Sequence, residues 1–241
     1  MSPLDRIRLE KAAADCGFER EPVLVTENKL ELRSALFPEV VHVRLAGPME
    51  YALTASLSEL LPPAVAPASE VVVSGIKELY AVLQHAAALA RTLPNRIADR
   101  FRKQTEAMPK ATEAQRLVVQ RVGQDLFRGA LLDYWQGRCC VTGLAVPSLL
   151  RASHIKPWAK CASDNERLDV FNGLLLAPHL DALFDGGWIS FSDQGGILVS
   201  KQLSAAAFAQ LGIALEWSIS GLKTAHRGYL AHHREHEFRH G

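Results

Sequence analysis

The segment from Arg138 to Asp185 constrains the fold more than any other part of the chain. Short apolar runs alternate in it with isolated polar residues, which is the pattern of brief strands rather than of long helices. A proline then opens a run with helical periodicity. A β-hairpin packed on a helix is a compact scaffold that holds polar side chains at its strand ends. The pattern predicts strands at Cys139–Thr142, Leu149–His154 and Leu174–Ala177, and a helix from Pro178 to about Phe184.

Helical periodicity precedes this segment. Apolar residues recur at intervals of three and four from Ile76 to Ala90, and a second helical run covers Arg96–Met108. Thr112 followed by Gln115 is a capping-box pattern that opens a long helix to about Gln136. Beyond the hairpin, the pattern predicts a second strand pair at Trp188–Ser192 and Gly196–Ser200, and a helical tail from Lys223.

The first ninety residues have the pattern of a small mixed region. Extended segments are predicted at Pro22–Val25, Leu30–Leu36, Val40–Leu45 and Val71–Ser74. The stretch Leu60–Ser69, LLPPAVAPAS, is either a linker or a loop that lies on a core. We therefore predict an α+β protein with a mixed α/β domain at residues 1–108 and a second domain at residues 109–241, which comprises the hairpin, its leading helix and the helical tail.

Composition excludes several classes of protein. The 241 residues are 48% hydrophobic and 22% charged, which is typical of a folded globular chain. No run approaches the roughly 20 apolar residues of a membrane helix, and Met1–Lys11 lacks the apolar core of a secretion signal. Four cysteines without a CxxC pair are too few for a disulfide framework. The expected setting is a reducing cytoplasm, with no membrane partner.

Charge is unevenly distributed along the chain. Residues 1–90 contain 8 Lys and Arg against 12 Asp and Glu, whereas the remainder is basic and brings the chain to a net charge of +1. A basic C-terminal part is compatible with a local site for a polyanion such as nucleic acid.

The residues RCCVTGLAVPSLLRASHIKPWAKCASDNERLDVFNGLLLAPHLDALFD, from Arg138 to Asp185, resemble the HNH nuclease family. The similarity is to the branch with C-x-TG, ASHIxPW, ERLD-x-x-NGLLL and LFD in that order, and it covers about the last half of the chain from around Thr112. The resemblance implies a C-terminal ββα-metal domain that hydrolyses DNA with a divalent cation. Mg²⁺ is the first candidate, and Mn²⁺ or Ni²⁺ are the alternatives.

Two polar residues of the motif are candidates for catalysis. His154 ends a predicted strand, and its near-neutral pKa suits removal of a proton from water. The resemblance gives Asn172 the task of holding the His154 loop through side-chain hydrogen bonds. The structural alternatives are a buried hydrogen-bonded histidine and an asparagine that caps the turn at Gly173.

The helix after Pro178 has the candidate metal ligands. Family spacing from Asn172 points to His179 or Asp181 as the main ligand. Asp185 shares a helix face with Asp181 and is either a further ligand or a cap for the turn at Gly186-Gly187. Ser153 stands where many family members have an acidic metal ligand, and a hydroxyl is a poorer ligand than a carboxylate.

Basic residues cluster around the motif. They form a candidate rim for DNA phosphates, although a solvated surface also mixes charges. The rim consists of Arg138, Arg151, Lys156, Lys160 and Arg167, with Arg116, Arg121 and Arg128 as an extension on the preceding helix.

These patterns predict a metal-dependent HNH endonuclease of the restriction or defence type, with a recognition or regulatory module at residues 1–108. The rival hypothesis is a DNA- or partner-binding protein on a catalytically degenerate HNH scaffold, with Ser153 marking lost metal affinity. Target sequence, base modification, nicking against double-strand cleavage and a homodimeric state stay open.

Overall fold

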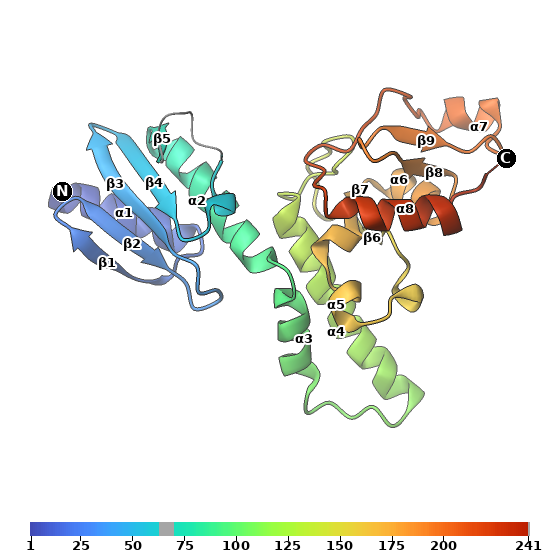
Figure 1. Cartoon of the computed structure of the whole chain (residues 1–241), viewed down its shortest axis with the longest axis horizontal. Helices are drawn as coiled ribbons and strands as arrows, with labels where there is room; N and C mark the ends of the chain where they lie inside the picture. Colours follow the sequence, from blue (N-terminus) through green and yellow to red (C-terminus); the bar gives the residue numbers. More distant parts are fainter. Residues whose placement is uncertain (63–69, 241) are drawn as a thin grey trace. The chain divides into compact units, whose positions relative to one another are not determined.

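The computed structural model describes residues 1–62 and 70–240, and it has an α+β fold (Figure 1). The chain divides into two compact units, Met1–Leu93 and Pro94–Gly241. Our sequence-based boundary lay after residue 108. The boundary observed in the structure lies earlier because helix α3 (Arg96–Thr105) packs on α4 (Glu113–Tyr134), and its Ile97 and Phe101 are part of the second hydrophobic core.

The first unit is a five-stranded antiparallel sheet with two helices. Its strands pair in chain order, so each strand lies beside the next one in the sequence. Leu30 and Leu32 alternate with partly exposed residues along β2, and they share a core with Leu9 of α1 and Leu83 of α2. The elements are α1 (Pro3–Asp15), β1 (Arg20–Thr26), β2 (Lys29–Arg33), β3 (Val41–Gly47), β4 (Glu50–Ala55), the 3₁₀ turn η1 (Ser58–Leu60), β5 (Val71–Ser74) and α2 (Ile76–Thr92).

The extended segments predicted in this unit coincide with β1, β2, β3 and β5, whereas α1 and β4 are additional. Helix α1 buries only Leu9, Ala12 and Ala13, so its sequence lacks a broad apolar stripe. The predicted linker or loop at Leu60–Ser69 lies largely outside the described residues; Leu60 and Leu61 at its start are buried in the core.

The second unit is built around the antiparallel pair β6 and β7, in which His154 lies opposite Gly173. The strands β8 and β9 form a separate antiparallel pair. After α3 and α4, the elements are β6 (Arg151–His154), the 3₁₀ turn η2 (Trp158–Lys160), α5 (Asp164–Arg167), the 3₁₀ turn η3 (Val170–Asn172), β7 (Gly173–Leu176), α6 (Pro178–Asp185), β8 (Ile189–Phe191), β9 (Ile197–Val199), α7 (Ala205–Gln210) and α8 (His226–His236).

Helices α4 and α6 both pack on the β6–β7 hairpin. Leu174, Leu175 and Leu176 are fully buried, so both faces of β7 are covered. Gly173 permits the close approach of α4, because a Cβ atom there would lie 2.6 Å from Cζ of Phe127 and 2.7 Å from the methyl groups of Leu131. The hairpin and its helices therefore form one rigid scaffold.

The predicted strand at Cys139–Thr142 is wrong. These residues form turns, because the segment folds back on itself: Gly143 N–H donates to the Cys139 carbonyl, and Cys139 N–H donates to the Leu144 carbonyl. Its link to β7 is the bond from Cys140 N–H to the Leu175 carbonyl. The short helices α5 and α7 were also not predicted.

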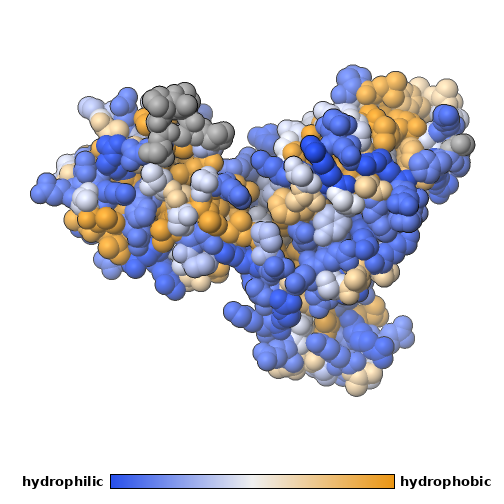
Figure 2. All heavy atoms as spheres, viewed as in Figure 1, coloured by the Kyte–Doolittle hydropathy of each residue, from blue (hydrophilic) through white to orange (hydrophobic). Residues whose placement is uncertain are grey.

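Two further properties concern the surface of α3 and the length of the helices. The visible face of α3 is mainly hydrophilic (Figure 2), in keeping with its exposed Arg100, Arg102 and Lys103. In the described part of the chain, none of the helices combines the length and the apolar character that crossing a bilayer requires.

Candidate active site

A pocket of about 350 Å³ opens where β6 ends. Successive side chains of a strand point to opposite faces, so Ala152 and His154 share one face of β6, whereas Arg151 and Ser153 share the other. The pocket is lined by Ala152, His154, Ile155, Pro157, Trp158, Asp185, His233 and Glu237. The predicted base and one predicted metal ligand thus face the same space.

Two aromatic rings hold the imidazole of His154. The ring stacks on Phe127 of α4, with centroids 3.9 Å apart and an interplanar angle of 15°. The Trp158 ring meets it edge-on, with a centroid distance of 5.5 Å. Trp158 in turn packs over Gly123, where a Cβ atom would lie 2.7 Å from the indole. Bare backbone at Gly123 therefore leaves room for the ring that positions His154.

The hydrogen bonds of His154 define its tautomer. Its Nε2 lies 2.8 Å from the carbonyl oxygen of Arg167, and a carbonyl only accepts, so Nε2 carries the proton. Nδ1 then has the lone pair, and it has no hydrogen-bond partner within residues 1–62 and 70–240. Burial lowers the pKa of His154, and the Arg167 carbonyl partly offsets this effect. The neutral imidazole presents a free basic nitrogen at physiological pH.

Asn172 fastens the loop that follows His154. Its side chain is fully buried, and its Oδ1 accepts the N–H of Lys156 at 2.8 Å. Its Nδ2 donates to the carbonyls of Lys156 at 3.2 Å and Glu166 at 3.1 Å. The Asn172 carbonyl also accepts the N–H of Ile155. One side chain therefore ties together the segments before and after the loop.

Two carboxylates and a hydroxyl meet beside β6. Ser153 Oγ donates to Oδ1 of Asp185 at 3.0 Å. Burial raises the pKa of Asp181, the charge of Asp185 raises it further, and Ser153 and Arg151 oppose both effects. Burial also raises the pKa of Asp185, and Ser153 opposes it. The two acids occupy one electrostatic site that a cation would stabilise.

The other predicted ligand, His179, is exposed and lies elsewhere. Its ring faces Trp217, with centroids 6.3 Å apart. The side-chain hydrogen bond of Asp185 is to Ser153 on β6 rather than to the turn at Gly186-Gly187. The geometry thus groups Ser153, Asp181 and Asp185 and leaves His179 apart. Within the described ranges, no three His, Cys, Asp or Glu side chains gather as a metal site.

Residues 139–192 match the family model described as HNH endonuclease. This segment is an HNH domain. The match includes β6, β7, α6 and β8, and therefore His154, Asn172 and both carboxylates. A comparison with curated proteins gives no match to the chain.

The basic residues predicted to bind DNA differ in their surroundings within the second unit. Arg151 is exposed and acts on Asp181, and Arg138 is exposed after α4. Lys156 pairs with Glu166 at 2.6 Å, and Lys160 pairs with Glu237 at 2.6 Å. Arg167 donates to the carbonyls of Trp158 and Cys161 and pairs with Asp164. Arg128 likewise donates to the carbonyls of Leu150 and Pro147. Arg138 and Arg151 are thus exposed members of the predicted rim that make no ion pair among the described residues.

Sequence reasoning missed several residues that line the pocket or pack on its histidine His154. Phe127 lies four positions after Gly123, and this helical spacing of a small and a large apolar residue was the available signal. His233 and Glu237 lie on and just after the C-terminal helix α8, and no local pattern links them to His154. The Trp158 ring was also missed, and it packs on Gly123 of α4 and on His154.

Proposed function

We propose that the chain is a metal-dependent endonuclease that hydrolyses DNA phosphodiester bonds through its HNH domain. The observation that carries this proposal is the unpartnered Nδ1 of His154 in a pocket that also receives Asp185. A base on one side of phosphorus and a carboxylate site for a cation on the other is what in-line hydrolysis needs.

In this mechanism, Nδ1 of His154 removes a proton from the attacking water. The Arg167 carbonyl, the Phe127 ring and the Asn172 hydrogen bonds hold the imidazole in one orientation during the transfer. Arg151 contacts the substrate phosphate from the exposed side of β6. A bound divalent cation would offset negative charge on the phosphate and on the leaving 3′ oxygen.

The donors present fit a hard cation. Asp181, Asp185 and the Ser153 hydroxyl provide oxygen atoms, and Mg²⁺ binds through one or two carboxylates while it keeps several waters. The same oxygen donors accept Mn²⁺, whereas Ni²⁺ favours nitrogen donors such as imidazole. The pKa values of Asp181 and Asp185 are raised, as expected for two carboxylates whose negative charges a bound cation would stabilise. Mg²⁺ or Mn²⁺ is therefore our first choice.

The first unit is proposed as a recognition or regulatory module of a restriction or defence nuclease. Its separate hydrophobic core supports an independent role. A cytoplasmic setting is supported by the four cysteines, all of which are buried free thiols. If the protein cuts both strands, a homodimer would supply the second active site.

One observation favours the rival function, a scaffold that binds DNA without cutting it. Ser153 replaces the acidic ligand of many HNH nucleases, and the described residues offer no third carboxylate or imidazole at Asp181 and Asp185. Loss of that ligand would weaken metal binding and leave the fold intact.

Cleavage of supercoiled plasmid tests both functions. Wild type and His154→Ala are compared on modified and unmodified plasmid in Mg²⁺, Mn²⁺, Ni²⁺ and EDTA, and DNA binding is measured in parallel. If the protein is a nuclease, wild type alone should convert supercoiled plasmid in the presence of metal, and His154→Ala should bind DNA as well as wild type does. Binding without cleavage in every metal would instead support the degenerate scaffold.

A further inference from the structure

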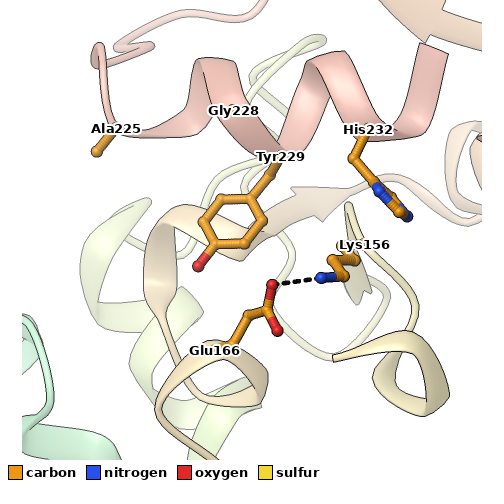
Figure 3. Close-up of a pocket in the computed structure, with 6 residues that line it drawn as sticks. All are labelled: Lys156, Glu166, Ala225, Gly228, Tyr229 and His232. Atoms are coloured by element: carbon orange, nitrogen blue, oxygen red, sulfur yellow. Dashed lines mark hydrogen bonds and ion pairs between the residues drawn. The ribbon is translucent and has the colours of Figure 1, made fainter. Parts of the chain in front are cut away.

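A second pocket of about 350 Å³ lies beside helix α8 and outside the residues that we assign to hydrolysis (Figure 3). It is lined by Lys156, Glu166, Ala225, Gly228, Tyr229 and His232. This volume is at the small end of the range for ligand pockets, and it suits one compact ring system. Ala225 and Gly228 leave the helix surface almost bare, since a Cβ atom at Gly228 would meet no heavy atom within 4 Å.

The polar groups of this pocket are balanced in charge. Lys156 Nζ lies 2.6 Å from Oε1 of Glu166, and Oε2 of Glu166 accepts the N–H of Ala162. His232 is the third polar group; burial, His236 and Lys156 lower its pKa, whereas Glu237 raises it, so the ring is neutral at physiological pH. The Nε2 atom of His232 is buried and makes no hydrogen bond, and it lies 3.7 Å from Oε1 of Glu237. A phosphate would find no net positive charge here, whereas a neutral ligand with both donors and acceptors would find matching groups.

One wall of the pocket is aromatic. Tyr229 is held in place because its hydroxyl donates to Oδ2 of Asp169 at 3.0 Å. Figure 3 shows its ring beside the Lys156–Glu166 pair, with Gly228 next to it on the same helix. A fixed ring next to an uncovered helix surface can stack with a flat ligand.

We infer that this pocket binds a nucleobase, with the base stacked on Tyr229 and its edge hydrogen-bonded by Lys156, Glu166 and His232. The base is either extruded from the DNA substrate or part of a free nucleoside. The inference builds on the proposed function, because the backbone of Lys156 is clamped by Asn172 and lies two residues from His154. A bound base would therefore touch the loop that positions the proposed catalytic histidine.

Glycine replacements provide a clean test. Gly228→Leu fills the pocket, and its backbone is helical, so the fold should be retained. Gly129→Leu is the matched control, because Gly129 is also an exposed helical glycine where an added Cβ would meet no heavy atom within 4 Å, and it lies on α4 away from the pocket. Tyr229→Leu should weaken base binding about 5- to 150-fold, the equivalent of one lost stacking contact.

Two binding assays with the full chain in EDTA separate the sources of the base. Calorimetry measures the binding of adenosine, guanosine, cytidine and thymidine, and fluorescence follows 2-aminopurine placed within duplex DNA. Nucleoside binding, or a change in 2-aminopurine emission, that is lost in Gly228→Leu and kept in Gly129→Leu supports the inference. The assay that responds identifies a free nucleoside or an extruded base. No response in either assay, or a response equal in both variants, overturns it.

Neither assay depends on phosphodiester cleavage. A protein that cleaves plasmid but gives no base-dependent signal would refute the pocket inference and leave the nuclease intact. A protein that binds bases but does not cleave in any metal would refute the nuclease and leave the pocket inference standing.

Discussion

Two histidines of the second unit line the same pocket in nearly matching surroundings, yet only one of them has a free nitrogen. His154 stacks on Phe127 at 3.9 Å and donates from Nε2 to the Arg167 carbonyl. His233 stacks on Phe184 at 3.8 Å and donates from Nε2 to the Phe184 carbonyl at 3.1 Å. The Nδ1 of His233 accepts a hydrogen bond from Ser190 Oγ at 2.9 Å, whereas no described residue donates a hydrogen bond to Nδ1 of His154.

This difference separates a candidate base from a structural histidine. A stacked ring and a carbonyl partner fix the orientation and the tautomer in both cases. Proton transfer further requires a lone pair that a water molecule can reach, and Ser190 removes it from His233. Burial lowers the pKa of His233 to about 4, with the Phe184 carbonyl opposing the effect, so this ring stays neutral without serving as a base.

Apart from replacement of His154 itself, the largest expected effect is at the carboxylates beside it, because the proposed base works together with a cation. Replacing both Asp181 and Asp185 by Ala should reduce metal-dependent cleavage about 10²- to 10³-fold, the equivalent of several kcal/mol of charge stabilisation. Single-turnover cleavage in Mg²⁺ measures this loss. Asp125→Ala, an exposed acid on α4, is the control and should retain full activity. Unchanged cleavage in the double variant would remove the metal from the mechanism.

The next effect concerns the loop that holds His154. Asn172→Ala leaves several buried backbone groups without a partner, at a cost of about 1–3 kcal/mol for each. Urea unfolding followed by tryptophan fluorescence measures the loss, and all four tryptophans lie in the second unit. Cleavage at a temperature where the variant stays folded should also decrease, because the imidazole loses its fixed position. Full stability and full activity of Asn172→Ala together would show that the Asn172 hydrogen bonds do not hold the His154 loop in place.

The third effect is the pH dependence of stability at His233. Its pKa is about 4 in the folded protein and near 6.5 when unfolded, so the unfolded chain binds the proton first as pH falls. His233 therefore contributes stability above pH 6.5 that is lost between pH 6.5 and 4, with a maximum of about 3 kcal/mol. His233→Gln should flatten this part of the curve. Urea unfolding from pH 7 to pH 4 compares the two proteins, and equal slopes would contradict the assignment.

The smallest effect is a shift in the pH profile of cleavage. Because burial lowers the pKa of His154, wild type should keep its base neutral below pH 6.5. Phe127→Leu removes the stacked ring and admits water, so the pKa should rise and the acid limb of the cleavage rate should move to higher pH. Single-turnover rates from pH 5 to pH 8 measure the limb. If the acid limb of the pH–rate profile is the same in Phe127→Leu and wild type, Phe127 does not control the pKa of His154.

The sequence predicted those parts of the site that lie close together along the chain. Apolar runs predicted the strands of the β6–β7 hairpin, and Pro178 marked the start of α6. The resemblance to HNH nucleases named His154, Asn172, Asp181 and Asp185 as candidate site residues. It also named His179, which the structure places beside Trp217, because residues two apart at a helix start point in different directions. The turns at Cys139–Thr142 are apolar enough to resemble a strand, and only their backbone hydrogen bonds distinguish them.

The contacts that distinguish the two histidines join distant parts of the chain. Phe127 reaches His154 from α4, and Ser190 reaches His233 from β8. No pattern in the sequence predicts either of these two contacts, because only tertiary packing brings the residues together. The N-terminal helix α1 was missed for a related reason: it buries few apolar residues and owes its start to the Ser2–Asp5 capping box.

Single-turnover cleavage by His154→Gln and His233→Gln, each against wild type, tests directly whether His154 is the base and His233 is not. Circular dichroism first establishes a temperature at which all three proteins are folded. With His154 as the general base, we expect a rate about 10²- to 10⁴-fold lower for His154→Gln and a rate within about threefold of wild type for His233→Gln. Equal losses in the two variants, or a His154→Gln protein as fast as wild type, would contradict this assignment.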